Sequence, residues 1–435
     1  MNAVFNQSVL DGVIPQQFPN FEMSWEKTAT TNIGFVSHHM RQRLMFEAEY
    51  YIKNTTDMLI QPTQYRTLGV VTTPQVNAAA MKATGIDISA GWRDKAGDLR
   101  YSINMNVGYT VNEITDYRGK LRYELDDTVL DIHGYPSMRY TNLAEVSASI
   151  DNRRILEGHP HGEFFMRRVY TGTGTHTNSD GSVNPKGGPK DGMIRTRADL
   201  DWVRAMIAEG YSFNANTVGH SGGQLWYGEL LYEDANDDGR LGHADDPVFL
   251  GKTQVPKWTF GLNLSAEWRG IDMSMHWSGR LGSYHYIHSR GINSSGLPSV
   301  GDALPADVLK MYYFYDPQAA SANGGDNDYC PSRDPNANHT GLFPRILSSD
   351  GRHQASSYYL YNTSFLKLKS LQVGYSLPKQ WLEPARISNM RVFISCENLL
   401  TIKHKDFRGV DPELGGSINV YPIPQMFAGG LSLTF

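Results

Sequence analysis

The chain has 435 residues, of which 42 are Gly and 24 are Tyr, and its mean hydropathy is -0.43 although 40% of its residues are hydrophobic. No apolar run approaches the ~20 residues that a transmembrane helix needs, so a helical membrane protein is excluded. The net charge of -5 is small and is not gathered into a basic face, so nucleic acid is not an expected partner. The composition favours one large all-β body, either soluble or a membrane barrel whose alternate residues face lipid.

Two hairpins are predicted in the first quarter of the chain. The first covers about 27–56, and the second pairs a strand at 86–92 with one at 99–109 across a turn at 93–98. The alternation of apolar and polar residues over 99–109 lasts about eleven residues, the length that a tilted strand needs to cross a bilayer, whereas soluble strands average about five or six. This hairpin therefore favours a membrane barrel.

The strand at 99–109 separates two chemical faces. A dry core would leave its polar side chains unpaired, so we expect its apolar side chains to face lipid and its polar side chains to face a wet interior. The apolar set is Leu99, Tyr101, Ile103, Met105 and Val107, and the polar set is Arg100, Ser102, Asn104 and Asn106.

Long polar connections separate the later hairpins. The segment 115–223 is rich in Gly and Pro and contains a predicted short strand within 157–170 and an amphipathic helix over 197–209; a second long connection covers 282–357. Loops this long count against a compact soluble domain but are expected on the outer side of a barrel.

The last predicted strands lie at 258–268 and 271–277, then near 365–375 and 392–396, and finally at 425–435, giving about ten or eleven strands in all. Trp258 and Trp268 stand at opposite ends of one strand, which predicts indoles at both membrane interfaces. The closing strand repeats with a period of two and ends at Phe435. An exposed apolar edge of this kind recruits other strands, so a closed barrel suits it, and the alternative is the last strand of a soluble sandwich.

Several stretches resemble the C-terminal part of SusC/RagA-type TonB-dependent outer-membrane transporters, in the order and spacing of that family. They are WEKTATTNIG at 25–34, YYIKNTTD at 50–57, EGHP at 157–160, YEDANDDG at 232–239, FLKLKSL at 365–371 followed by GYSLP at 374–378, and ENL at 397–399.

The resemblance implies the C-terminal half of a large antiparallel transmembrane β-barrel with long extracellular loops, in the outer membrane of a Gram-negative bacterium. Such a barrel is plugged and 22-stranded, contacts outer-membrane lipid, imports a glycan or peptide, and is capped by a SusD-like surface lipoprotein. Residues 1–435 show nothing that resembles the plug, the TonB-contacting segment or the first barrel strands, so we expect a fragment that would meet the TonB complex only through the missing N-terminal part. The alternative function is a soluble or surface all-β carbohydrate-binding or adhesion protein.

One acidic loop repeats the spacing of a calcium site. Oxygen ligands occur at positions one, three and five, a Gly at six and a carboxylate at twelve, and the backbone carbonyl at seven completes the set. The alternative is an acidic surface turn that satisfies its own backbone. The candidate calcium ligands are Asp234, Asn236, Asp238, Arg240 and Asp245.

The remaining candidate residues concern binding and insertion. With no nucleophile elbow, phosphate loop or inferable pair of carboxylates in the sequence, no enzymatic activity is expected. Loop aromatics could stack on sugar rings or dock a partner, although each could equally pack its own loop; they are Trp226, Tyr286, Tyr312, Tyr313, Tyr315 and Tyr329. The resemblance implies an insertion signal in the closing strand, formed by Phe427, Leu431, Leu433 and Phe435.

Overall fold

The computed structural model describes most of the chain. The described residues are 2–5, 8–11, 20–60, 75–117, 122–141, 148–149, 153–215, 217–219, 224–287, 312–314, 330–334, 336–345, 355–407, 409, 411–415 and 421–435.

Nine long strands form one sheet in the order β21-β20-β19-β16-β15-β6-β5-β4-β3, and each neighbouring pair is antiparallel. Each long strand lies beside the long strand that precedes it along the chain, so the sheet is an up-and-down meander. The strands are β3 Lys27–His39, β4 Leu44–Ile60, β5 Val76–Ala96, β6 Leu99–Tyr117, β15 Trp258–Trp268, β16 Ile271–Leu281, β19 Phe365–Ser376, β20 Asn389–Lys403 and β21 Met426–Thr434.

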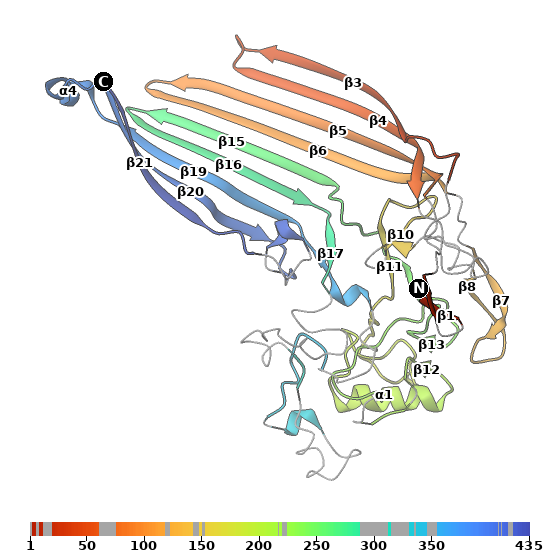
Figure 1. The fold of residues 1–435 in the computed structure, drawn as a ribbon. Coiled ribbons are helices and arrows are strands. Elements are labelled where there is room, and N and C mark those ends of the chain that lie inside the picture. Colours follow the sequence, from red (N-terminus) through yellow and green to blue (C-terminus); the bar gives the residue numbers. More distant parts are fainter. Residues whose placement is uncertain are drawn as a thin grey trace.

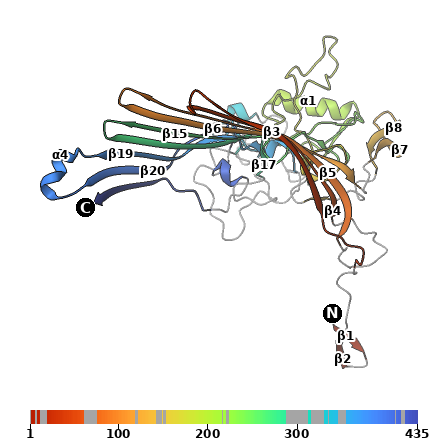
Figure 2. The ribbon, with the colours of Figure 1, turned by 90° about the horizontal axis from the view of Figure 1, so that it is seen from above.

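Short turns lie at one end of the sheet and long connections at the other (Figure 1). The β5–β6 turn is only Gly97 and Asp98, and the β15–β16 turn is Arg269 and Gly270; the φ angles of Gly97, Arg269 and Gly270 are positive. These left-handed conformations give the turn a twist that matches the twist of the flanking strands. Seen from above, the sheet is curved, and β4 and β5 bend away from the other strands at the long-connection end (Figure 2).

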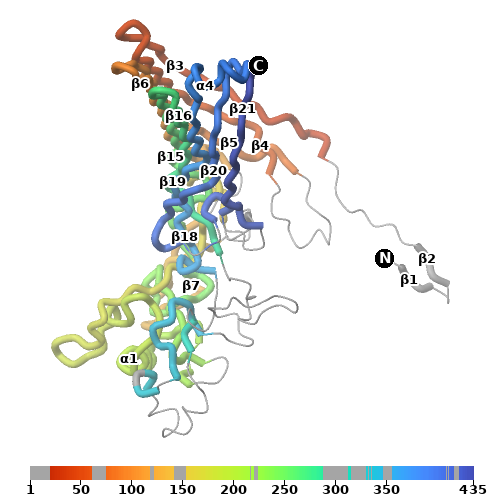
Figure 3. The backbone as a smooth tube through the Cα atoms, turned by 90° about the vertical axis from the view of Figure 1, so that its left-hand side faces the viewer, coloured from red at the N-terminus to blue at the C-terminus, as the bar shows by residue number. Residues whose placement is uncertain are grey.

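A smaller body packs at the long-connection end, well away from the short turns (Figures 1 and 3). Its helix α1, Arg197–Ala208, begins with a capping box in which the Thr196 side chain accepts from Asp199 N and the Asp199 side chain accepts from Thr196 N. Leu200, Trp202 and Met206 of α1 are buried in the body's aromatic core. The helix therefore forms where the sequence predicts it.

The remaining elements are short. The strands are β1 Asn2–Phe5, β2 Ser8–Asp11, β7 Tyr123–Leu130, β8 Pro136–Tyr140, β9 Ala148–Ser149, β10 Arg153–Arg154, β11 Glu163–Met166, β12 Ser212–Phe213, β13 Arg240–Leu241, β14 Val248–Phe249, β17 Tyr284–Tyr286 and β18 Leu360–Asn362. The helical turns are α4 Lys379–Leu382, η4 Pro331–Arg333, η5 Ser357–Tyr359, η6 Glu383–Ala385 and η7 Pro412–Leu414. No helix among the described residues is long and apolar enough to span a membrane.

One face of the sheet, here called the apolar face, presents unbroken rows of hydrophobic side chains. The strand registers align Ile33, Tyr50, Ile86, Tyr109, Trp258 and Leu281 in one row across six strands. Ile33 is 74% exposed and Ile103, further along β6, is 42% exposed. Within the described residues no second sheet covers this face, so the sandwich alternative is wrong and the face suits lipid.

Aromatic residues stand at both ends of the apolar face. Tyr109 packs on Trp258 at the long-connection end, with ring centroids 4.5 Å apart, and Trp92 Nε1 donates to the Tyr101 hydroxyl near Trp268 at the turn end, at 3.3 Å. The two tryptophans are ten residue steps apart, which span ~33 Å along β15, or ~25 Å at a tilt of ~40°. This separation matches the height of the apolar band of an outer-membrane barrel.

Several strand boundaries differ from the prediction. The first strand of the second predicted hairpin, β5, begins at Val76 and not near Ile86, and β20 covers Asn389–Lys403 and not only 392–396. Periodicity alone missed these extensions because they carry small or polar residues, such as Ala79 and Asn389, that only cross-strand pairing assigns to the ladder. Nine of the expected strands form this sheet, and the short strand expected within 157–170 is β11, which pairs with β10 and β14 in a separate sheet.

Candidate functional site

The opposite face, here called the polar face, carries hydrogen-bonded side chains from neighbouring strands. Ser102 and Ser265 lie 2.8 Å apart through their hydroxyls, and Arg100 pairs with Glu267 at 3.4 Å. As expected, Arg100 and Ile103 fall on opposite faces, because they stand three residues apart on one strand and successive side chains alternate between the faces. Their partners on β15 are Glu267 and Leu264. One further row across this face is Asn104, Asn263, His276, Ser370 and Glu397.

A β-bulge in β19 places two lysines on the polar face. Leu368 pairs with Trp277 and Ser370 with His276, so Lys369 has no counterpart on β16. The extra residue shifts the alternation by one position, so Leu368 and the later Leu371 both stay on the apolar face. Lys367, opposite Ser278, lies on the polar face together with Lys369.

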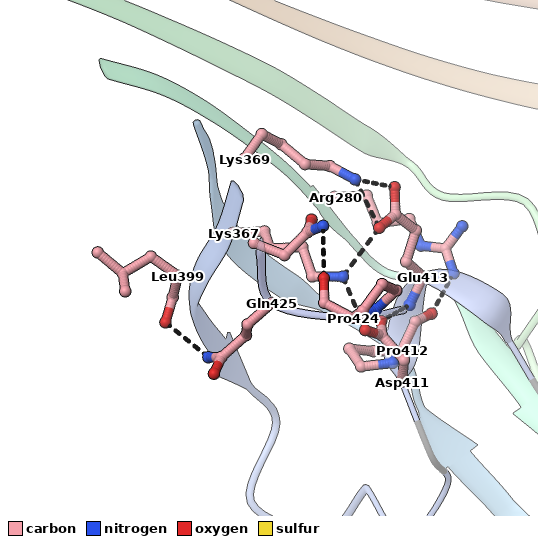
Figure 4. Close-up of polar contacts among 10 residues, drawn as sticks. Arg280, Lys367, Lys369, Leu399, Asp411, Pro412, Glu413, Pro424 and Gln425 are labelled. Carbon is pink, nitrogen blue, oxygen red and sulfur yellow. Dashed lines mark hydrogen bonds and ion pairs between the residues drawn. The ribbon is translucent and has the colours of Figure 1, made fainter. Parts of the chain in front are cut away.

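The two lysines hold the segment around η7 against the sheet; we call residues 411–413 the latch (Figure 4). Lys367 Nζ lies 2.7 Å from Asp411 Oδ2 and 2.9 Å from Glu413 Oε2, and Lys369 Nζ lies 2.6 Å from Glu413 Oε2. Lys367 is 1% exposed. A buried ammonium needs such partners, so the latch is the reason that Lys367 can lie buried beside the long-connection end of the sheet.

Arg280 strengthens the same contact. Its Nη2 donates to the Pro412 carbonyl at 2.6 Å, and its guanidinium lies over the Phe365 ring, 5.3 Å from the centroid. Although burial alone would raise the pKa of Glu413, hydrogen bonds from Lys369 and Lys367 lower that pKa overall. The Glu413 carboxylate therefore stays ionised and bound to the lysines at neutral pH.

A second charged cluster lies on the polar face at the turn end. Arg391 on β20 pairs with Asp272 on β16, with Nε 2.9 Å from Oδ1, and reaches across Gly374 of β19. Its guanidinium lies 4.9 Å from the centroid of the Phe393 ring, and that ring covers Gly430 of β21. Glycines on the intervening strands give the bulky side chains room to lie flat on the sheet.

The body beyond the sheet contains a cavity of about 740 Å³. Its walls include Arg168, Tyr170, Lys186, Tyr211 and Asp234, so it offers aromatic rings beside charges of both signs. A pocket of this size and mixed lining can hold a small polar ligand.

The acidic loop borders this cavity and folds on its own backbone. Asp234 Oδ1 accepts from Asp238 N at 3.1 Å and its Oδ2 accepts from Gly239 N at 2.7 Å. Asp246, adjacent to the predicted ligand Asp245, accepts from Ala235 N at 2.8 Å and from His243 N at 2.7 Å and so closes the two ends of the loop. Within the described part of the chain, no three His, Cys, Asp or Glu side chains are grouped closely enough to hold a metal ion by themselves.

Burial shifts the titration of the acidic loop. It raises the pKa of Asp234 and of Asp238, and nearby carboxylates add to both shifts. The pKa of Asp246 rises to about 7, again chiefly through burial. Several acidic groups therefore share a site without a basic partner strong enough to hold their pKa values down.

The predicted loop aromatics occupy different environments. Trp226 and Tyr313 are at most 1% exposed in the body's core, and Tyr312 stacks on Phe343 with ring centroids 5.1 Å apart. Tyr286 packs partly buried against the same core, while Tyr315 and Tyr329 lie outside the described residues. The burial of the four described aromatic residues favours a role in packing the core of the body over a role in stacking on a ligand.

The closing strand β21 pairs on one side only among the described residues. Phe427, Leu431 and Leu433 lie on the apolar face, opposite Cys396, Val392 and Met390 of β20. Phe435 follows the strand and is 85% exposed. The β3 edge is the other unpaired edge of the described sheet.

Curvature, long strands, an apolar outer face and a polar inner face together define a segment of a transmembrane β-barrel wall. The family model described as "TonB dependent receptor-like, beta-barrel" matches residues 5–192. The TonB-dependent receptor P3 of Formosa agariphila is 22% identical over 449 residues, which cover 100% of this chain and 36% of that relative. The TonB-dependent receptor SusC of Bacteroides thetaiotaomicron is 29% identical over 214 residues, 48% of this chain and 18% of SusC.

Solved structures agree on the fold. The RagAB peptide transporter matches with a TM-score of 0.62 at 21% identity, over 100% of this chain and 38% of that chain. The RagAB peptide importer in the "open-open" state matches with a TM-score of 0.63 at 20% identity. The chain is therefore similar to TonB-dependent receptors over its whole length, and these receptors reside in the outer membrane of Gram-negative bacteria. It spans a little over a third of the length of these relatives.

Proposed function

We propose that this chain forms part of the barrel wall of an outer-membrane importer for a bulky nutrient, a glycan or a peptide. The observation that carries the proposal is the nine-stranded sheet with one exposed apolar face and one hydrogen-bonded polar face, matched over its whole length to TonB-dependent receptors. A wall of this kind separates lipid from a polar lumen, and a polar lumen is the path of a hydrophilic nutrient. The family is one of transporters and receptors, and the proposal assigns no enzymatic activity.

The partners are part of the same proposal. The body at the long-connection end would meet a SusD-like surface lipoprotein, since SusC and the RagAB complex are among the relatives. Energy would come from the TonB complex through a plug outside this chain. Peptide is the substrate of the RagAB importer, and the mixed aromatic and charged cavity of the body suits either a peptide or a glycan.

Growth of the native host tests this proposal. A strain deleted for the gene should lose growth on one nutrient class, glycans or peptides, when that class is the sole source supplied. The wild-type gene should restore growth and the protein should be found in the outer membrane. Unchanged growth on every glycan and peptide tested, or recovery of the protein in the soluble fraction, would contradict the proposal.

A further inference from the structure

The polar face carries a group of basic side chains at its long-connection end. Arg280 stands near the end of β16, and Lys367 and Lys369 stand on the neighbouring strand β19. Both strands are paired on each side, so the sheet fixes the backbone beneath these three cations. In the proposed importer this end is the outer mouth of the nutrient path, so the cations face an entering solute.

Two carboxylates of the chain itself occupy this basic group. Lys367 Nζ bonds Asp411 and Glu413, and Lys369 Nζ bonds Glu413 (Figure 4). Asp411 Oδ1 also accepts from Glu413 N at 2.9 Å, so the turn of the latch and its ion pairs form together. The latch therefore presents carboxylates to the wall as an acidic solute would.

The latch does not use the full bonding capacity of the basic group. Three cations share two carboxylates, and Arg280 bonds the latch through the Pro412 carbonyl only. The Arg280 Nε atom is buried and has no hydrogen-bond partner among the described residues. An unmatched buried donor costs free energy, and a guanidinium binds a carboxylate best through two parallel N–H groups. Arg280 therefore points to a further acceptor that the latch does not supply.

We propose that Arg280, Lys367 and Lys369 form a binding subsite for a carboxylate of the transported solute, and that the latch occupies this subsite until an acidic solute displaces it. Exchange of one carboxylate for another keeps the buried Lys367 paired, so displacement leaves no uncompensated cation. The tether gives the latch carboxylates an effective concentration on the order of millimolar, so solutes with several carboxylates compete best. The subsite rests on the proposed importer role and adds the charge of the solute to it.

Calorimetry with two acidic probes and the complete receptor, purified in detergent, tests the subsite. Oligomers of aspartate and of galacturonate of equal length carry the same carboxylates on a peptide and on a glycan, and so distinguish the two sources. We expect one probe to bind, and Lys369→Gln to weaken that binding about tenfold or more. Glu413→Gln should tighten it by a similar factor, because this change removes a competing carboxylate and leaves Asp411 to pair with Lys367.

Hydrogen exchange shows whether a bound probe displaces the latch. The amides of Leu414 and Gly415 donate to the carbonyls of Asp411 and Pro412 at 3.1 and 3.3 Å, so they exchange slowly while the latch is formed. A bound probe should speed their exchange about tenfold or more, because it opens the turn. Arg280→Lys keeps the charge but loses the planar fork, and it should weaken probe binding even if Lys369→Gln fails to fold.

Glu47→Gln and Lys53→Gln are the matched controls. Both residues lie on the polar face of β4, away from the subsite, three positions to either side of Tyr50 on the apolar face. Each variant should leave probe binding within about twofold of the wild type. Probe binding that Lys369→Gln and Glu413→Gln leave unchanged would overturn the proposal, as would binding without faster exchange in the latch. Failure of both probes to bind would overturn the subsite and leave the importer role standing, since growth and localisation test that role.

Discussion

At the scale of single residues, Lys367 is the side chain whose role depends most on its surroundings. It is 1% exposed and bonded to two carboxylates of the latch, whereas Lys27 pairs with Asp57 on the surface with its side chain 72% exposed. The two lysines form ion pairs of nearly equal length, 2.7 and 3.0 Å. The burial of each ion pair, and not the distance between its atoms, decides how much removal of one partner destabilises the fold.

We therefore predict that Lys367→Met lowers the free energy of unfolding by about 3 kcal/mol, because it leaves Asp411 without its ammonium partner. The control Lys27→Met should cost less than about 1 kcal/mol. Urea unfolding of the complete receptor in detergent, followed by tryptophan fluorescence, measures both. Equal losses for the two variants would mean that the latch adds nothing beyond a surface ion pair.

Two adjacent glycines of the closing strand provide a second residue-scale prediction. A Cβ on Gly430 would lie 2.3 Å from the Phe393 ring, whereas a Cβ on Gly429 would meet no atom nearer than the Phe393 carbonyl oxygen at 4.0 Å. Gly430→Ala should therefore destabilise the barrel by about 1–3 kcal/mol through overpacking, and Gly429→Ala should stay within about 0.5 kcal/mol. The same unfolding experiment checks the pair, and a larger loss for Gly429→Ala would refute the placement of Phe393.

At the scale of elements, the alternation along β6 separates the two environments of the sheet. Ile103 and Asn104 are neighbours near the middle of the span between Leu99 and Tyr109, yet they pair with Leu264 and Asn263 on opposite faces. Only the apolar face lies against lipid in a barrel of this family.

We predict that Ile103→Arg lowers the stability of the inserted barrel by about 2–4 kcal/mol, the cost of a charge at the bilayer midplane. Asn104→Arg should be tolerated, because its charge faces a wet lumen. Heat-modifiable migration of the two variants from outer-membrane fractions provides the measurement. Loss of the folded band for Asn104→Arg with retention for Ile103→Arg would reverse the assignment of the faces.

At the scale of the whole molecule, the sheet has two long edges. β3 and β21 each pair on one side only among the described residues, and β21 carries the exposed apolar residues Phe427 and Leu431. Unpaired edges of this length recruit other strands. The chain spans a little over a third of the length of its relatives, and closure of a barrel requires that both edges pair with further strands.

We predict that the 435-residue chain expressed alone is recovered as aggregate or as an open sheet. Co-expression with an N-terminal segment that supplies the remaining strands should restore a membrane-inserted, heat-modifiable barrel, and deletion of Phe435 should abolish that restoration. Sedimentation and outer-membrane fractionation distinguish these results. A soluble, monomeric and cooperatively folded chain in buffer without detergent would count against the whole barrel assignment.

The sequence by itself determined the long strands, their two faces, helix α1 and the turn at Arg269 and Gly270, because period, capping and turn preference are local properties of the chain. It also carried the family resemblance, which the relatives confirm. Tertiary structure alone decided that β6 pairs with β15 across the long connection 118–257 and that Lys369 forms a bulge.

The same holds for burial: only the packed body shows that Trp226 and Tyr313 are interior and that Lys367 is enclosed by the latch. Pairing, register shifts and burial depend on contacts between residues far apart in the chain, and no local pattern records those contacts.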